Sequence, residues 1–183
     1  MESFEYRLAI GEDFEKIVLL ENQNLATVLT DDQKSDGFLS GSFTAEQLRL
    51  MAQNVAIVVA RNGNDLIGFV CASTAEFNSQ RPLVAAMIAR FPEIVIEKQR
   101  LDELKSFIAG PVCVDKNYRG QGVFEGLYET LFRDAPVQYQ AVLALVSTVN
   151  PRSVRAHEKV GMKVVDSFNF DGRGFLIIAR RIR

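Results

Sequence analysis

Residues 110–127 carry the sequence GPVCVDKNYRGQGVFEGL. The first part of this stretch is apolar, as in a buried strand. A short polar segment follows, and Arg119-Gly120-Gln121-Gly122 then leads into an amphipathic segment. This order predicts a strand that feeds a helix through a glycine-rich turn. The first N–H groups of such a helix lack intrahelical acceptors and lie at the positive end of its dipole. Because glycine lets the backbone close on a bulky anion, the stretch predicts a phosphate site.

The bulk composition is that of an ordinary globular protein. The chain has 183 residues, of which 48% are hydrophobic and 24% charged, so it is long enough to bury a core within one domain. Its formal net charge of −2 gives no overall attraction to nucleic acid or to anionic membranes. No apolar run is long enough to span a bilayer, and the start MESFEYRLAI matches no signal or transit peptide. We expect a cytoplasmic protein without a nucleic-acid or membrane partner.

The thiol and imidazole content argues against a metal centre or a disulfide framework. Cys71 and Cys113 each lie inside an apolar run, as buried thiols do in a reducing compartment. The chain has a single histidine, His157, and no zinc or haem spacing. We therefore expect no metal cofactor.

The first half of the chain predicts elements in the order β-α-α-β-β. Alternating polarity over residues 4–10 predicts a strand, and apolar spacing from residue 13 to about 29 predicts a helix. A polar loop is expected over 30–41, and Thr44 with Gln47 predicts a capping box at the start of a helix that ends near Met51. Apolar runs over 55–61 and 65–75 flank Asn62-Gly63, a strong hairpin signal.

An elaboration follows at residues 76–105. About thirty residues are far more than a hairpin connection needs. We expect a helix over about 83–90, a break at Pro92, and a second helix in the charged segment 97–105. Two roles stay open at this point: a surface flap that covers a sheet edge, or a wall of a substrate pocket or a dimer contact.

The second half predicts the order β-α-β-α-β-β. Strands are expected over 107–114, 141–146, 162–170 and 175–182, the second of them buried on both faces. One helix is expected from Gly120 to about residue 133. A second helix is expected to begin at Asn150-Pro151, with Asn150 as N-cap and Pro151 in the first turn, and to end at Gly161, which suits the glycine that follows a helix. No linker divides the chain, so we expect one domain over residues 1–183.

Two motifs in this half resemble those of the GNAT superfamily of acyl-CoA-dependent N-acyltransferases. The pyrophosphate motif of that family is Arg or Gln, two residues, Gly, one residue, then Gly or Ala; Arg119 and Gly122 match it, and Phe124 departs from its last position. The second signature is matched by Asn150, Ser153, His157 and Gly161-Met162. The order of elements is similar over most of the chain, and the specific part covers residues 107–165.

The resemblance implies a fold and a set of binding residues. The fold is an α/β (α+β) domain with a mixed, mostly antiparallel sheet of six to seven strands, helices on both faces and a splayed central strand pair, 107–114 and 141–146. Acetyl-CoA is implied as the acyl donor, and a homodimer is implied as well. The implied coenzyme-binding residues are Val112, Cys113, Val114, Arg119, Gly120, Gln121, Gly122, Val123, Phe124, Asn150 and Ser153.

The implied chemistry is direct attack of a primary amine on the thioester within a ternary complex. Backbone N–H groups of Val112 or Val114 are the expected donors to the oxyanion. His157 is the candidate catalytic residue, as general acid to the departing thiolate; packing of a helix histidine on the sheet is the alternative. No general base stands out. A base acting through ordered water is one candidate, and the others are four carboxylates: Asp36, Glu76, Asp102 and Glu103. Cys113 as a nucleophile would require an acyl-enzyme.

A second functional class stays open beside the enzyme. The Phe124 departure and the missing base on the strand 107–114 are also compatible with a non-catalytic acyl-CoA sensor. The glycine turn does not favour a dinucleotide enzyme, because no acidic ribose-binding residue closes a strand about 20 residues later. The acceptor amine is not identified by the sequence.

Overall fold

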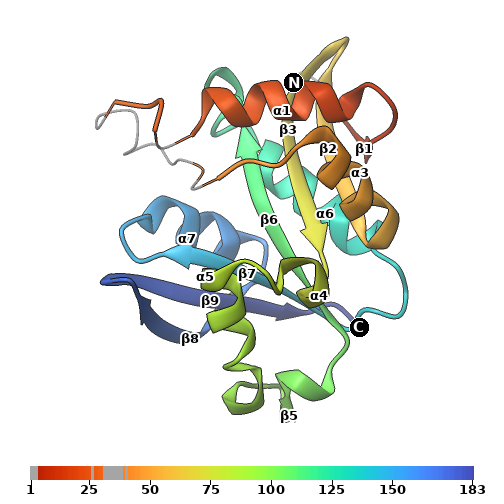
Figure 1. Ribbon diagram of the computed structural model, residues 1–183. Helices are drawn as coiled ribbons and strands as arrows, with labels where there is room; N and C mark the ends of the chain where they lie inside the picture. The colour runs from red at the N-terminus through yellow and green to blue at the C-terminus, as the bar shows by residue number, and fades with distance from the viewer. Residues whose placement is uncertain (1–3, 26, 31–38, 40) are drawn as a thin grey trace. The chain divides into compact units, whose positions relative to one another are not determined.

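The computed structural model describes residues 4–25, 27–30, 39 and 41–183 (Figure 1). The chain forms two compact units: unit 1 comprises residues 1–72 and 111–135, and unit 2 comprises residues 73–110 and 136–183. The loop expected over 30–41, with Asp36, lies largely outside the described residues. None of the helices in the described part of the chain has the length and apolarity needed to cross a membrane.

Unit 1 contains a strand-rich core with three long helices. Its elements are β1 (Glu5–Leu8), α1 (Asp13–Gln23), α3 (Ala45–Asn54), β2 (Ala56–Asn62), β3 (Asp65–Ser73), the last part of β6 (Ser106–Val114), the 3₁₀ turn η3 (Lys116–Tyr118) and α6 (Val123–Asp134).

Unit 2 contains the elaboration and the C-terminal strands. Its elements are α4 (Ala75–Asn78), α5 (Pro82–Ile88), η1 (Phe91–Glu93), β4 (Val95–Ile96), β5 (Gln99–Arg100), η2 (Leu101–Glu103), the first part of β6, β7 (Ala141–Ser147), α7 (Pro151–Lys159), β8 (Lys163–Phe170) and β9 (Arg173–Arg181).

Seven strands are hydrogen-bonded in the order β1-β2-β3-β6-β7-β9-β8. The β6–β7 pair is parallel, and the pairs β1–β2, β2–β3, β7–β9 and β8–β9 are antiparallel. The sheet is therefore mixed and mostly antiparallel, as the sequence predicted. The expectation of a single domain stays a prediction, since the contacts divide the chain into two units.

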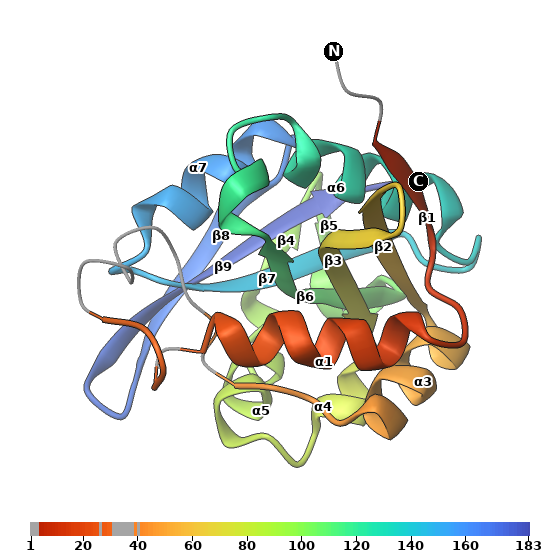
Figure 2. The same cartoon turned by 90° about the horizontal axis from the view of Figure 1, so that it is seen from above.

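In unit 1, α1 and α6 lie on opposite faces of the strands β1 to β3 (Figure 2). The side chains of β2 are buried from Ala56 to Arg61, because both faces of this strand are covered. The capping box predicted at Thr44 is present: its Oγ accepts from the N–H of Gln47, and the Gln47 side chain accepts from the N–H of Thr44. Helix α1 ends earlier than predicted, at Gln23. The Asn24 side chain bonds the Leu20 carbonyl and so competes with the backbone for helical hydrogen bonds.

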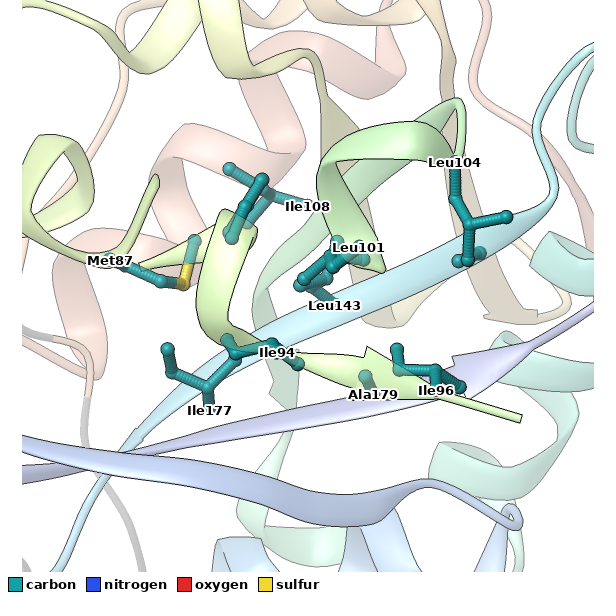
Figure 3. Packing of buried hydrophobic residues seen from close by; sticks show 11 residues of the cluster. Met87, Ile94, Ile96, Leu101, Leu104, Ile108, Leu143, Ile177 and Ala179 are labelled. Carbon is teal, nitrogen blue, oxygen red and sulfur yellow. The ribbon is translucent and has the colours of Figure 1, made fainter. Parts of the chain in front are cut away.

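In unit 2 the elaboration packs as a layer on β7 and β9 (Figure 3). This layer and the facing strand residues form one buried apolar cluster: Met87, Phe91, Ile94, Ile96, Leu101, Leu104, Ile108, Ala141, Leu143, Ile177 and Ala179. Burying six large side chains from the segment provides the driving force that orders it. The segment covers interior strands and not the sheet edge that was expected, and its roles as a pocket wall or a dimer contact stay predictions.

The second helix predicted within the elaboration is wrong. Glu97 and Lys98 have φ angles of 48° and 73°, which form the tight turn of the β4–β5 hairpin. Leu101 and Leu104 then enter the apolar cluster from η2. The helix prediction rested on charged residues with good helix propensity, and burial of apolar side chains on either side of the turn outweighs that preference.

Candidate active site

The glycine-rich turn in unit 1 has the geometry of an anion site. Gly120 and Gly122 have φ angles of 77° and 82°, in the left-handed region that glycine adopts without steric cost. Gly122 is the N-cap of α6, so the helix begins at Val123 and not at Gly120 as predicted. Gly120, Gln121 and Gly122 are exposed, and a Cβ built on either glycine would meet nothing within 4 Å. The space in front of the helix start is open to an anion.

Two side chains hold this turn in place. Arg119 donates from Nε to the Val114 carbonyl and from Nη2 to Asn24 Oδ1, both at 3.0 Å. Gln121 donates from Nε2 to the Asn117 carbonyl at 2.9 Å. The guanidinium thus joins the turn to the end of β6 and to the end of α1. No sequence pattern predicts the contact with Asn24.

The start of α6 is fixed by close approach to two strands. A Cβ on Gly68 of β3 would lie 3.1 Å from the Cys113 carbonyl oxygen, 3.2 Å from Val123 Cγ1 and 3.3 Å from Leu127 Cδ1, so a side chain there would require these neighbours to shift by a few tenths of an ångström. A Cβ on Gly126 would lie 2.3 Å from the Tyr6 ring. These contacts set where α6 sits on the sheet of unit 1.

Phe124, the irregular member of the pyrophosphate motif, is directed along α6. Its ring stacks on that of Tyr128, one helical turn later, with centroids 4.8 Å apart and an interplanar angle of 27°. Phe124 is the second residue of the helix, and its ring packs against a residue of the next turn. The departure from the motif is therefore compatible with anion binding through the backbone.

The strand residues Val112, Cys113 and Val114 lie in the part of β6 that belongs to unit 1. Val112 and Val114 are partly exposed, whereas Cys113 is buried. Burial raises the pKa of Cys113 to about 12 although the positive charge of Arg119 opposes the shift. The thiol is therefore protonated near neutral pH, which argues against a nucleophilic cysteine.

The first part of β6, in unit 2, pairs with β7 over three residues. The register runs Ser106↔Ala141, Phe107↔Val142 and Ile108↔Leu143. Gly110 follows with φ of 141°, and Pro111, which has no N–H to donate, comes next. The described pairing of β6 with β7 thus ends at Ile108, before Gly110 and Pro111.

Unit 2 holds the second signature on α7. Asn150 is the N-cap, and its Oδ1 accepts from the N–H of Ser153 at 3.1 Å. Gly161 has φ of 79° just after the helix, as predicted for its C-terminal glycine. Asn150, Ser153 and His157 thus lie on successive turns of one helix.

His157 is buried, with 2% of its surface exposed. Its Nδ1 lies 2.7 Å from the Ser153 carbonyl oxygen, and since a carbonyl only accepts, Nδ1 carries the proton. Burial lowers the pKa of His157, and the bond to the Ser153 carbonyl opposes part of that shift. In the neutral ring Nε2 is then an acceptor, so donation from Nε2 requires a second proton.

The comparisons with known proteins agree with these motifs. The model of the acetyltransferase (GNAT) family matches residues 25–162, about three quarters of the chain. The chain belongs to the GNAT acetyltransferase family. No curated protein sequence matches it.

Solved GNAT structures share this fold at low sequence identity. An N-acetyltransferase from Staphylococcus aureus Mu50 is 17% identical with a TM-score of 0.64, and the match covers 99% of both chains. The Salmonella typhimurium acetyltransferase YncA, solved with its cofactor acetyl-CoA, is 12% identical with a TM-score of 0.62 over 98% of this chain and 94% of that one. The ribosomal-protein-S18-alanine N-acetyltransferase of Escherichia coli is 11% identical with a TM-score of 0.60, at the same coverage. At these identities the likeness concerns the fold.

The carboxylates proposed as bases of this GNAT protein lie at the surface wherever they are described. Glu76 is exposed on α4. Asp102 and Glu103 are exposed and form ion pairs with Arg100 at 2.7 and 3.4 Å. Asp36 lies outside the described residues.

The sequence reasoning missed a buried acid on α1, Glu21. This side chain is fully buried, and its Oε2 accepts from the N–H of Phe43 at 3.1 Å. Its negative charge contributes to the raised pKa values of Cys71 and Cys113, so it lies near β3 and β6. The glutamate stands at an inward position of the amphipathic pattern of α1, which was the available signal.

Proposed function

We propose that the protein is an N-acetyltransferase that moves the acetyl group of acetyl-CoA to a primary amine by direct attack in a ternary complex. The observation that carries the proposal is the exposed turn of Gly120 to Gly122 at the start of α6, which follows Arg119, in a chain of the GNAT family. The left-handed glycines and the open space in front of them fit a pyrophosphate.

The coenzyme is assigned to residues of both motifs. The backbone N–H groups of Gly120 to Phe124 would bind the pyrophosphate, and the backbone of Val112 to Val114 would bind the pantetheine arm. Asn150 and Ser153, at the start of α7, are the further contacts implied by the second signature. Since Oδ1 of Asn150 already accepts from Ser153, its amide nitrogen is the group that we assign to the ligand.

Acetyl-CoA supplies a thioester, and the chain must then hold the oxyanion and protonate the leaving thiolate. A backbone N–H of Val112 or Val114 is the proposed oxyanion donor, and loss of one such donor elsewhere costs about 2.7–4 kcal/mol of transition-state stabilisation. The amine must be neutral to attack. Deprotonating a lysine-like amine costs about 4 to 5 kcal/mol at pH 7, whereas an α-amino group costs about 1.

His157 remains the proposed proton donor to the thiolate. Its lowered pKa makes the doubly protonated ring scarce at pH 7. Since the neutral fraction of the amine also falls with pH, this role predicts that the ratio of wild-type to His157→Ala turnover rises as the pH falls toward the pKa. His157→Ala should then lower kcat by about 10²-fold or more. An unchanged kcat across the pH range would leave His157 a packing residue of α7.

The test of the function separates binding from turnover. Wild-type protein is titrated calorimetrically with acetyl-CoA and with CoA, and thiol release is then followed with a panel of α-amino, lysine, polyamine and aminoglycoside acceptors. Binding with thiol release that depends on one acceptor class supports the enzyme and identifies that class. Binding without turnover on any amine would favour the sensor, and absence of binding would overturn both.

A further inference from the structure

We propose that Asn24, at the end of α1, is a positioning residue of the coenzyme site, acting through Arg119. The proposal rests on the proposed function, because it assigns the pyrophosphate to the turn that Arg119 begins. Asn24 lies 95 residues before Arg119 and outside both family motifs. Its only link to that turn is through three-dimensional contact.

The contacts form a chain from α1 to the turn. The Asn24 side chain donates from Nδ2 to the Leu20 carbonyl at 2.9 Å, which fixes the orientation of the amide. Its Oδ1 then faces Arg119 and accepts from Nη2 at 3.0 Å. The same guanidinium donates from Nε to the Val114 carbonyl at 3.0 Å. One planar group thus spans the end of α1 and the end of β6.

Burial and charge make this bond stronger than an ordinary surface contact. Asn24 has 9% of its surface exposed, so water competes little for Oδ1. Hydrogen bonds with one ionised partner are stronger than neutral ones. The cation also lies at the C-terminal end of α1, where the helix dipole is negative. The low exposure of Asn24, the charge of the guanidinium and the helix dipole all favour an Arg119 side chain that points toward the protein interior.

Because its guanidinium points inward, Arg119 acts on the bound anion through the backbone of the turn. Its Nε and Nη2 groups are engaged with Val114 and Asn24, while its own backbone leads directly into Gly120 and Gly122. Both glycines are exposed and lack any Cβ that packing could hold. The Arg119 side chain is therefore the anchor that keeps the backbone N–H groups of this turn preorganised, and Asn24 holds the anchor.

The alternative is that Asn24 only ends α1 and contributes to stability. Asn78 offers a matched control, because it is also a buried asparagine near a helix end, 4% exposed. Its Nδ2 donates to Ser73 Oγ at 2.7 Å and to the Thr74 carbonyl at 2.9 Å. Asn78 lies in unit 2, and these hydrogen bonds join it to residues outside both motifs. Loss of its hydrogen bonds should lower stability without affecting the turn.

The experiment compares Asn24→Leu, Asn24→Asp and Asn78→Leu by calorimetric titration with acetyl-CoA and by thermal unfolding. Both leucine variants should lower the unfolding temperature. Asn24→Leu should weaken acetyl-CoA binding about tenfold, the size typical of removing the partner that orients a ligand-binding group. Asn78→Leu should bind within about twofold of wild type. Asn24→Asp keeps an acceptor for Arg119 but loses the donor to the Leu20 carbonyl, so its affinity should lie between those of Asn24→Leu and wild type.

A double-mutant cycle tests whether Asn24 affects acetyl-CoA binding through Arg119. Arg119→Leu should weaken binding, and adding Asn24→Leu to it should cause no further loss, because the two side chains act through one contact. Should Asn24→Leu fail to fold, Asn24→Ala replaces it in every arm. Binding by the Asn24 variant within twofold of wild type, or additive losses in the cycle, would overturn the proposal. If the wild-type protein does not bind acetyl-CoA, the proposed function fails and this inference fails with it.

Discussion

The sharpest perturbation of the assigned coenzyme site is a change of charge at Gly122. This residue has φ of 82° and ψ of 5° and is the N-cap of α6, and a Cβ there would meet nothing within 4 Å. Asn and Asp both tolerate the left-handed region better than other residues with a side chain, and both are good N-caps. Gly122→Asn and Gly122→Asp therefore form a pair of nearly equal shape that differs in one negative charge.

The two variants should differ in opposite directions for stability and for binding. A carboxylate at a helix start interacts favourably with the dipole by about 0.3–1 kcal/mol, so Gly122→Asp should be at least as stable as Gly122→Asn. Next to a bound pyrophosphate the same charge is repelled. Two like charges about 5 Å apart repel by about 1 kcal/mol in water and by about 3 kcal/mol at an effective dielectric constant of 20. We therefore expect Gly122→Asp to bind acetyl-CoA at least about tenfold more weakly than Gly122→Asn.

Calorimetric titration with acetyl-CoA at low and at high salt measures this difference directly. The gap between the variants should narrow as salt increases, because the repulsion acts between exposed charges. Urea unfolding of both variants provides the stability arm. Equal affinity of the two variants for acetyl-CoA at low salt would show that no anion lies at this helix start, and the assignment of the turn would be refuted.

Three further predictions concern the fold around the two motifs. Burial lowers the pKa of His157 below its ordinary value of 6.5, so as the pH falls the unfolded chain protonates this imidazole before the folded chain does. The free energy of unfolding should therefore decrease as the pH drops below about 6.5. In urea titrations, His157→Gln should remove this contribution of His157 to the pH dependence of stability. Gly126→Ala should lower stability by about 1–3 kcal/mol, since its Cβ would lie 2.3 Å from the Tyr6 ring; an equal loss in a Tyr6→Ala background would show that this clash is not the cause. Asp13 is fully buried and pairs with Arg7 at 2.6 Å and Arg61 at 3.0 Å, so Asp13→Asn should cost about 3 kcal/mol in urea unfolding, and a loss below 1 kcal/mol would contradict the importance of the pair.

Local chemistry accounts for the parts of the fold that could be predicted. Thr44 with Gln47 and Asn150 with Pro151 are capping patterns whose hydrogen bonds close within four residues, and both are present. Alternating and continuous apolar runs located all the long strands, because the period of two and burial on both faces are written directly in the sequence. The motif spacing likewise located the turn at Gly122 and the helix that carries His157.

Segments whose structure depends on distant partners could not be predicted in this way. Residues 97–105 have the composition of a helix, but Leu101 and Leu104 bury against β7 and β9, which follow about 40 and 75 residues later. The end of α1 at Asn24 was missed for a similar reason. The Asn24 side chain bonds the nearby Leu20 carbonyl. Its link to the glycine-rich turn runs through Arg119, which lies in the other half of the chain.

The sequence alone determined the two family motifs, the capping patterns at Thr44 and Asn150, and the long strands, since each depends on neighbours along the chain. Only the tertiary structure decided that the Arg119 guanidinium faces Asn24 and Val114, that Phe124 stacks on Tyr128, and that Nδ1 of His157 carries the proton. A side chain's direction and protonation are set by the groups packed against it in three dimensions. Composition and spacing contain no record of which groups those are.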